Sequence, residues 1–459
     1  MAVLTRTTAW KNFLLSGFFA GALVLSSPAG ASVFSPTIYD LANGVRLIVV
    51  ENPLSDAVGH MVWYRTGAAD EPDGKTGLAH YLEHMMFKGT AKHPAGSFDA
   101  IIARLGGDQN AYTSYDTTAY YEIVPAKNLA LVMSLEADRM RGLLIEENEA
   151  QSEKNVVLSE REERTGNSSV GAFREELRRV LFPLHPYGRP IIGLRKDVER
   201  LTPDDLRAFY RKAYAPQNAV VVVSGNVKHD QVAALAAATY GRLAGGFRPK
   251  QPPKISQISH PLKPLFIKED ARIKQPFVTR QYIVSSALKN RQDSLALDVL
   301  SEVLTGGEVG ILYRHFVIKT RTASGTSAGY NGTTRGPSVF SITASPTPGQ
   351  TVEHLNQDIA AYLRHLAHKG IKTREVEGAK QRLLDSAVFA RDKLLAPAQI
   401  LGEAEAVGLG AEMVEKWPDN IRRVSTAQVN AALQRLVSNK NMVAGILKPP
   451  AMEEKNEKR

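Results

Sequence analysis

The sequence predicts an α+β protein made of two structurally similar halves. Short β-rich runs alternate with longer helical patterns, which is the order expected of mainly antiparallel sheets that carry packed helices. This order occurs once before and once after residues 246–266, a segment rich in Pro, Gly and Lys that is typical of a linker. A chain of 459 residues is also too long for one ordinary core, so two domains are expected.

The first half begins with two β-rich runs, "NGVRLIVVEN" and "GHMVWYRTGA", and a helical pattern then starts at Thr76. A second helix is expected over "SFDAIIARLGG", with Ser97 as a possible N-terminal cap and two glycines as its end. The alternating runs "NAYTSYD" and "TTAYYEIVP" predict two more strands. Helices follow from Asn128 to about Arg179, with a break near residues 165–167. A capped helix from Thr202 and the buried strand "NAVVVVSGN" complete this half.

The second half repeats this order of elements. Its strands are expected at "FVTRQYIVSS", "SVFSITASPT" and "NMVAGILKP", with helices over "SLALDVLSEVLTGG", "TVEHLNQDIAAYLRHLAHKG" and "REVEGAKQRLLDSAVFARDKLL". The two halves also share a helix, an Asn-containing turn and an apolar strand in "LTPDDLRAFYRKAYAPQNAVVVVSGNV" and "VSTAQVNAALQRLVSNKNMVAGILKPP". We therefore expect similar domains at residues 32–245 and 267–450, followed by a charged tail at 451–459.

The first 31 residues have the pattern of a secretory signal peptide. Arg6 and Lys11 precede the apolar run from Phe13 to Leu25, and small residues at 29–31 suit cleavage. The alternative is a membrane anchor, but the run is shorter than the ~20 apolar residues that a spanning helix needs. We expect export across the inner membrane, to the periplasm, with no stable membrane insertion.

Composition excludes several kinds of site. The chain has no cysteine, so disulfides, thiolate metal ligands and cysteine nucleophiles are ruled out, and any metal is held by His, Asp or Glu. The net charge of +10 comes from scattered basic residues, without a stripe of interleaved aromatics. Binding of nucleic acid is therefore not expected.

The run "GLAHYLEHMMFKGT" contains the residues with the clearest chemistry. On a helix, His80 and His84 lie one turn apart on the same face, and Glu83 borders that face. Two imidazoles with a third ligand suit a catalytic Zn²⁺ site, although the same donors accept Mn²⁺ or Co²⁺. The alternative is a pair of ordinary histidines. In a chain with 11 histidines, however, His-x-x-Glu-His arises by chance on the order of once in a hundred.

A third ligand must come from elsewhere, and "QSEKNVVLSEREER" offers four glutamates. Glu153 and Glu160 are two helical turns apart and share one face. Spacing alone does not choose among Glu153, Glu160, Glu162 and Glu163, because most glutamates on a charged helix face solvent.

The chain resembles the pitrilysin family of inverted zinc peptidases, which includes insulin-degrading enzyme and the mitochondrial processing peptidases. The resemblance rests on "GLAHYLEHMMFKGT", "GGDQNAYTSYDTTAYYE", "EKNVVLSEREE" and "HPYGRPIIG". It implies two domains that form a clamshell around a chamber, one zinc ion bound by His80 and His84, and Glu83 as the general base. The third ligand of the family follows the second histidine by 76 residues, which selects Glu160 and leaves Glu153 to orient an imidazole.

The resemblance also implies a site for substrate on "NAYTSYDTTAYY". In the family this run is an edge strand that pairs with extended peptide, and its unpaired backbone groups bind any sequence. The candidates for substrate binding are Asn110, Ala111 and Tyr112. An ordinary core hairpin is the alternative for each of them.

One feature of active family members is missing from the second half. They carry an Arg followed seven residues later by a Tyr, and aligned on "ILYRHFVIKTRTASGTSAGY" these positions are Val317 and Ser324. Either Arg314, Arg321 or Tyr330 substitutes, or a second polypeptide supplies the pair. We expect a heterodimer in which a homologous subunit carries the Arg and the Tyr.

The function expected is a zinc-dependent endopeptidase that hydrolyses peptides or small unfolded polypeptides, with Glu83 moving the proton. A processing peptidase with defined cleavage sites is the nearest enzymatic alternative. A non-catalytic assembly subunit and a zinc-storage protein are the others. Neither of these two needs Glu83 beside two imidazoles.

Overall fold

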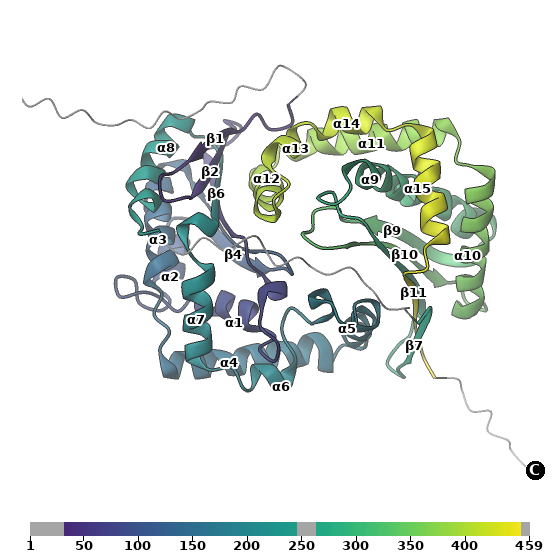
Figure 1. Cartoon of the computed structure of the whole chain (residues 1–459), viewed down its shortest axis with the longest axis horizontal. Helices are drawn as coiled ribbons and strands as arrows, with labels where there is room; N and C mark the ends of the chain where they lie inside the picture. Colours follow the sequence, from purple (N-terminus) through teal and green to yellow (C-terminus); the bar gives the residue numbers. More distant parts are fainter. Residues whose placement is uncertain (1–31, 246–262, 451–459) are drawn as a thin grey trace, which may run out of the picture.

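A computed structural model of the chain describes residues 32–245 and 263–450. The predicted signal peptide, most of the predicted linker and the charged tail lie outside the described residues. Two β-sheets with packed helices form the two halves, and this confirms the α+β prediction (Figure 1).

The first half contains a six-stranded mixed sheet in the order β1-β2-β6-β3-β5-β4. Its strands are β1 (Thr37–Asp40), β2 (Arg46–Glu51), β3 (Ala57–Tyr64), β4 (Asp108–Thr113), β5 (Thr118–Pro125) and β6 (Ala219–Gly225). Strand β6 is buried along its whole length between β2 and β3, as its unbroken apolar sequence predicts. Strand β4 lies at the open edge of the sheet and pairs with β5 alone.

Eight α-helices belong to the described part of this half: α1 (Leu78–Met85), α2 (Ser97–Arg104), α3 (Leu129–Gly142), α4 (Glu147–Arg161), α5 (Ser169–Leu181), α6 (Arg195–Val198), α7 (Pro203–Ala213) and α8 (His229–Ala238). The break expected near residues 165–167 is present, where a π turn (Glu162–Gly166) follows α4. The cap predicted for α2 is wrong: the cap residue is Gly96, and the Ser97 hydroxyl instead donates to the carbonyl of Pro94 at 2.6 Å.

The second half contains a five-stranded sheet in the order β7-β11-β8-β10-β9. Its strands are β7 (Leu265–Glu269), β8 (Phe277–Val284), β9 (Ala323–Tyr330), β10 (Ser338–Pro346) and β11 (Met442–Lys448). Strand β11 is parallel to β7 and antiparallel to β8, just as β6 is parallel to β2 and antiparallel to β3. The two sheets therefore share one topology, with β1 added to the first.

The helices of this half are α9 (Arg291–Thr305), α10 (Val352–Lys369), α11 (Thr373–Arg391), α12 (Ala396–Val407), α13 (Ala411–Glu415), α14 (Trp417–Arg423) and α15 (Thr426–Ser438). The helices α7 and α15 both begin with a capping box, formed by Thr202 with Asp205 and by Ser425 with Gln428. Each precedes an internal strand of its sheet, β6 or β11, so the pair of stretches recognised as similar in sequence is also similar in structure.

The two halves exchange helices. Helix α12 of the second half packs on the face of the first sheet that α1 does not cover, where it contacts β3 and β6, and Figure 1 shows it beside β6. Leu401 is buried there with Met61 and Trp63, whose indole N–H donates to the carbonyl of Ala398 at 3.2 Å. A Cβ on Gly402 would stand 2.0 Å from the indole nitrogen, so this close approach needs glycine.

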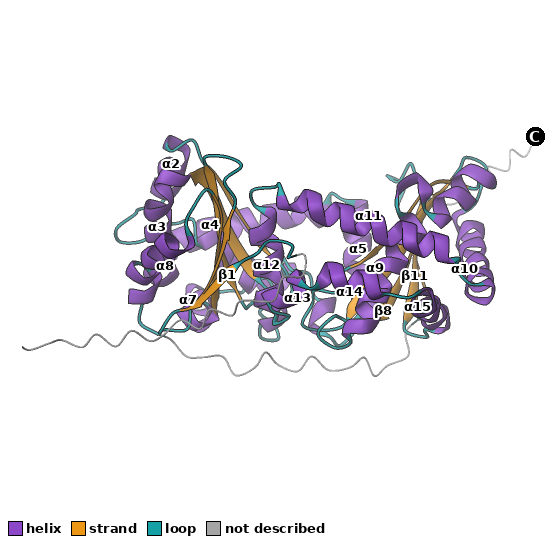
Figure 2. Cartoon of the chain, turned by 90° about the horizontal axis from the view of Figure 1, so that it is seen from above, coloured by secondary structure: helices purple, strands orange, loops and turns teal. Residues whose placement is uncertain are grey.

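Helix α5 makes the reciprocal contact with the second sheet. Its Phe173 and Leu177 are buried against Val443 and Leu447 of β11. Figure 2 shows α5 and α12 both lying between the outer layers of the molecule, each beside elements of the other half. Folding of each half therefore covers an apolar face with a helix from the other half.

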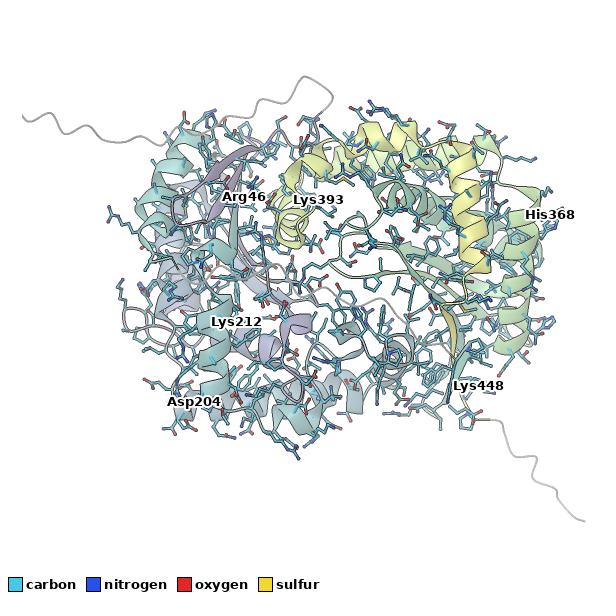
Figure 3. All side chains as sticks on the ribbon, in the orientation of Figure 1. Arg46, Asp204, Lys212, His368, Lys393 and Lys448 are labelled. Atoms are coloured by element: carbon cyan, nitrogen blue, oxygen red, sulfur yellow. The ribbon has the colours of Figure 1, made fainter. Side chains whose placement is uncertain are left out.

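Charged side chains cover the outside of both halves, as Asp204 and Lys393 illustrate in Figure 3. Among the described residues, no helix combines the length and the apolar character needed to cross a bilayer.

Candidate metal centre

Helix α1 carries the two histidines and Glu83, and a buried carboxylate holds its first turn. Glu71 accepts hydrogen bonds from the backbone N–H groups of Gly77 at 3.0 Å and Ala79 at 2.8 Å. Gly77 has a φ of 90°, and a Cβ there would lie 2.7 Å from the carbonyl oxygen of Ile192, so glycine is required at this turn. The Tyr81 hydroxyl of α1 donates a hydrogen bond to the backbone carbonyl of Ala150 in α4, which links the two helices.

His80, His84 and Glu160 come together between α1 and α4. One ligand atom from each lies within 4.8 Å of the others, and no other such group occurs in the part of the chain that is described. The Glu160 Oε2 atom stands 3.5 Å from Nε2 of His80 and 3.3 Å from Nε2 of His84. Tetrahedral ligands at about 2.1 Å from Zn²⁺ are roughly 3.4 Å apart, so these spacings suit that ion.

The polar atoms of this group also fit a cation. Oε2 of Glu160 is buried and receives no hydrogen bond from any described residue, although it faces two imidazole nitrogens. The other oxygen, Oε1, is 2.5 Å from the guanidinium of Arg164. One carboxylate oxygen and two imidazole nitrogens that face a common point are the donor set that a divalent N/O site requires.

Glu153 determines the orientation and tautomer of His84. The Nδ1–H of His84 donates to Glu153 Oε1 at 2.8 Å, which directs Nε2 at Glu160. Lys88 contacts the second oxygen of Glu153 at 2.5 Å. Burial opposes ionisation of Glu153, but the hydrogen bonds with His84 and Lys88 lower its pKa below the usual value.

The two imidazoles differ in their protonation. Burial, with help from the neighbouring His84, lowers the pKa of His80 from 6.5 to about 4, so this ring is neutral at pH 7. Burial acts in the same direction at His84, but the hydrogen bond to Glu153 and the negative charge of the nearby Glu160 outweigh it and raise the pKa to about 9. The carboxylates that make His84 basic also make it a stronger ligand.

Glu83 is separate from the three-residue group and has its own partner. Its side chain accepts a hydrogen bond from the Thr113 hydroxyl, 2.6 Å from Oε2, and the residue is 9% exposed. Burial raises the pKa of Glu83 above its usual value, and the bond from Thr113 opposes this rise. Thr113 is the last residue of β4, and no pattern in the sequence indicated that it holds Glu83.

The structure places Asn110, Ala111 and Tyr112 on β4, at the sheet edge predicted for them. The backbone N–H of Ala111 donates to the side chain of Asn110 at 2.8 Å, and the N–H of Gln109 donates to Asp108 at 2.9 Å. Local side chains therefore occupy these outward N–H groups. The Tyr112 ring is not at the edge, because it packs against Trp63 with the ring centroids 5.6 Å apart.

Two of the three second-half residues considered as substitutes for the missing pair have side-chain partners of their own. Arg314 is 3.0 Å from Glu375, and the Tyr330 hydroxyl donates to the carbonyl of Ser285 at 2.6 Å. The aligned positions Val317 and Ser324 lie in a π-helix (Tyr313–Lys319) and in β9.

Comparison with known proteins identifies the family of the chain. A family model described as Insulinase (Peptidase family M16) matches residues 46–194, and one described as Peptidase M16 inactive domain matches residues 200–383. Zinc protease PqqE of Helicobacter pylori is 31% identical over 389 residues, which cover 81% of this chain and 84% of that protein.

Solved structures show the same fold. A protease from Helicobacter pylori has a TM-score of 0.83 at 26% identity and covers 90% of this chain and 99% of its own. Pitrilysin has a TM-score of 0.72 at 21% identity, and the match covers 90% of this chain but 45% of pitrilysin. The resemblance to the pitrilysin family is thus confirmed, and the chain belongs to peptidase family M16.

Proposed function

We propose that the protein is a zinc-dependent endopeptidase that uses His80, His84 and Glu160 as metal ligands and Glu83 as general base. The observation that carries this proposal is the convergence of the three ligand atoms within 4.8 Å, with a separate buried carboxylate beside them. The name of the relative PqqE, a zinc protease, supports the choice of metal and reaction. A storage site would not need Glu83.

When bound, zinc supplies a Lewis acid that polarises the scissile carbonyl and favours ionisation of water. Glu83 accepts a proton from the attacking water and later delivers it to the nitrogen of the leaving amine. The raised pKa of Glu83 suits this double role, because the carboxyl must both take up and release a proton near neutral pH. Thr113 orients the carboxylate through one oxygen and leaves the other for water.

The substrates proposed are peptides and small unfolded polypeptides that add a strand to the edge of β4. Backbone groups at Gln109 and Ala111 alternate along this edge, and their present partners are exchangeable side chains. The strand ends at Thr113, so an added peptide runs toward Glu83. Enclosure of this edge in a chamber would exclude folded proteins.

We further propose that a homologous subunit completes the enzyme. The Arg and Tyr expected in the second half are absent, and Arg314 and Tyr330 are held within that half. Loss of an oxyanion donor costs about 3 kcal/mol of transition-state stabilisation, which a self-sufficient enzyme would not tolerate. The pattern of residues 1–31 supports assembly in the periplasm.

The test separates metal binding from catalysis. Glu83→Gln should bind one zinc ion per chain but lose peptide hydrolysis by about 10² to 10⁴ fold, because the base is absent and the ligands remain. Glu160→Gln should lose zinc. Glu162→Gln, an exposed neighbour on the same segment, is the control and should lose neither. Zinc content and cleavage of a quenched fluorescent peptide are measured for each, with and without a homologous subunit that carries the Arg and Tyr.

Hydrolysis by a zinc-loaded Glu83→Gln variant would remove Glu83 as the base. Full activity of the isolated monomer would contradict the need for a partner. Zinc binding without hydrolysis in any assembly would favour the non-catalytic subunit.

A further inference from the structure

Arg335 of the second half reaches across to two carboxylates of the first half. It lies between β9 and β10, and its side chain is 6% exposed. The guanidinium donates to both oxygens of Asp70, at 3.0 and 2.7 Å, and through Nε to Asp116 at 3.1 Å. The backbone N–H of Arg335 also donates to Asp116, at 3.0 Å. A guanidinium with two partners in fixed directions is a stronger positioning device than a surface ion pair.

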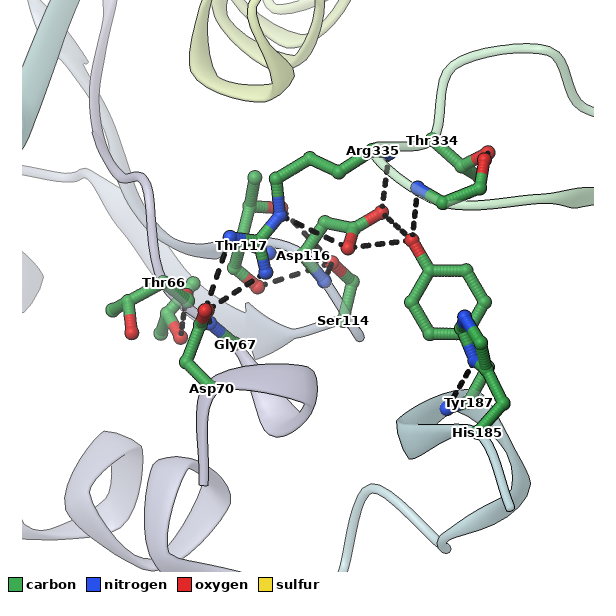
Figure 4. A network of polar contacts seen from close by, with 12 residues as sticks. Thr66, Gly67, Asp70, Ser114, Asp116, Thr117, His185, Tyr187, Thr334 and Arg335 are labelled. Carbon is green, nitrogen blue, oxygen red and sulfur yellow. Dashed lines mark hydrogen bonds and ion pairs between the residues drawn. The ribbon is translucent and has the colours of Figure 1, made fainter. Parts of the chain in front are cut away.

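The two carboxylates belong to segments that pack on each other. Asp70 ends a short helix (Ala68–Asp70), and Asp116 lies in the turn between β4 and β5. The backbone N–H groups of Ala68 and Ala69 donate to the carbonyls of Ser114 and Tyr115, at 3.0 and 2.8 Å. Figure 4 shows Arg335 bonded to both segments at once.

Tyr187 closes the network from a third side. Its hydroxyl donates to Asp116, 2.6 Å from Oδ2, and accepts from the backbone N–H of Gly336 at 2.8 Å. The turn that contains Asp116 is therefore held by Arg335 of the second half and by Tyr187 of the first, and Gly336 of the second half in turn holds the Tyr187 hydroxyl.

A short chain of bonds leads from this turn to Glu83. Ser114 accepts from the N–H of Asp116 at 3.1 Å through its hydroxyl and donates its own N–H to the carbonyl of Thr117 at 2.8 Å. The preceding residue, Thr113, donates to Glu83 at 2.6 Å. A shift of Asp116 thus moves the residue next to the one that orients Glu83.

We propose that Arg335 is a positioning residue, which holds the turn after β4 so that Thr113 presents its hydroxyl to Glu83. This inference rests on the proposed role of Glu83. It assigns to the second half an arginine that acts on the catalytic carboxylate without touching substrate. The competing account is that Arg335 merely fastens the two halves together.

The test compares Arg335→Lys with a matched variant at another contact between the halves. Lysine keeps the charge but cannot bond Asp70 and Asp116 in the same plane. Lys268→Met is the control, because Lys268 of β7 is 2.6 Å from Glu176 of α5, another ion pair between the halves. Each full-length variant is loaded with zinc and assayed in the assembly in which the wild type cleaves peptide.

Arg335→Lys should lower kcat by about 10 to 100 fold with KM and zinc content unchanged, since a small displacement of a catalytic group has effects of this size. Hydrogen exchange should rise in the segment 113–117. Lys268→Met should change neither. A kcat for Arg335→Lys within twofold of the wild type, or an equal loss in Lys268→Met, would overturn the proposal.

Hydrogen exchange also separates this proposal from the proposed function. If the zinc-loaded wild type cleaves no peptide in any assembly, the proposed function fails. Increased exchange at 113–117 in Arg335→Lys would then still support the positioning of this turn, and unchanged exchange would overturn it.

Discussion

At the scale of single residues, the two nitrogens of His84 have different partners and hence different roles. Nδ1–H is bonded to Glu153, and Nε2 faces Glu160 at 3.3 Å. His80 has no such support, because its Nδ1 is buried without a partner among the described residues. The orientation of the metal site therefore depends more on Glu153 than on any contact of His80.

Glu153→Gln should weaken zinc binding by about 10 to 100 fold, because a neutral amide no longer supports the basicity of His84. Turnover at saturating zinc should stay within a few fold of the wild type, since Glu83 is unchanged. Zinc affinity is measured by competition with a chelator. Lys88→Met is the control for loss of the Lys88–Glu153 contact. An unchanged zinc affinity in Glu153→Gln would rule out the role of Glu153 in supporting His84.

The sequence predicted these residues unevenly. His80, Glu83 and His84 were predicted from spacing, because four residues are about one turn of a helix. Spacing could not choose among the four glutamates of α4 and its π turn, since the choice depends on how α4 packs against α1. Arg335 was not predicted at all. A charged residue in a polar loop reads as solvated, and its partners are more than 200 positions away.

At the scale of elements, the open edge of β4 is the part of the sheet proposed to bind the substrate peptide. The pair Ser114 and Thr117 is hydrogen-bonded, so the alternation of an antiparallel ladder turns the N–H of Tyr112 toward β5 and that of Ala111 toward the open edge. The bond from Ala111 N–H to Asn110 agrees with this alternation.

Ala111→Pro should raise KM for peptides by about tenfold, because it removes one edge donor while leaving the ladder to β5 intact. The midpoint of unfolding should change little. Tyr112→Pro is the matched control and should destabilise the sheet, because it removes a ladder bond. Steady-state kinetics and urea unfolding of the two variants decide the matter, and an unchanged KM in Ala111→Pro would count against binding at this edge.

Many elements were predictable from sequence, and two strands that were not predicted, β7 and β9, share a cause. Strand β9, "ASGTSAGY", has small residues in place of the β-branched and aromatic ones that mark a strand, and it is held by β10 alone within its sheet. Strand β7 begins at Leu265, inside the segment expected as linker. The prediction of a linker there rested on the Pro and Lys residues of that segment. In both strands pairing in the sheet outweighs local preference.

At the scale of the whole molecule, the halves are joined by α12, by α5 and by the contacts of Arg335. These contacts involve separate surfaces, an apolar one on each sheet and a buried ionic one between them. A chain joined in this way is not expected to open between its own halves. The opening that admits substrate would then lie between this chain and its proposed partner.

The exchange of helices predicts that the halves unfold together. Leu401→Ala removes a fully buried side chain of α12 from the face of the first sheet, which should lower the free energy of unfolding by about 2 to 5 kcal/mol. Because α12 is anchored in the second half, β3 and β8 should lose protection at the same urea concentration, lower than in the wild type. Pulsed hydrogen exchange across a urea titration measures both strands, with Leu54→Ala, at a residue 69% exposed, as control. A shift of β3 alone would show that the halves are independent, and movement between them could then open the site without a partner.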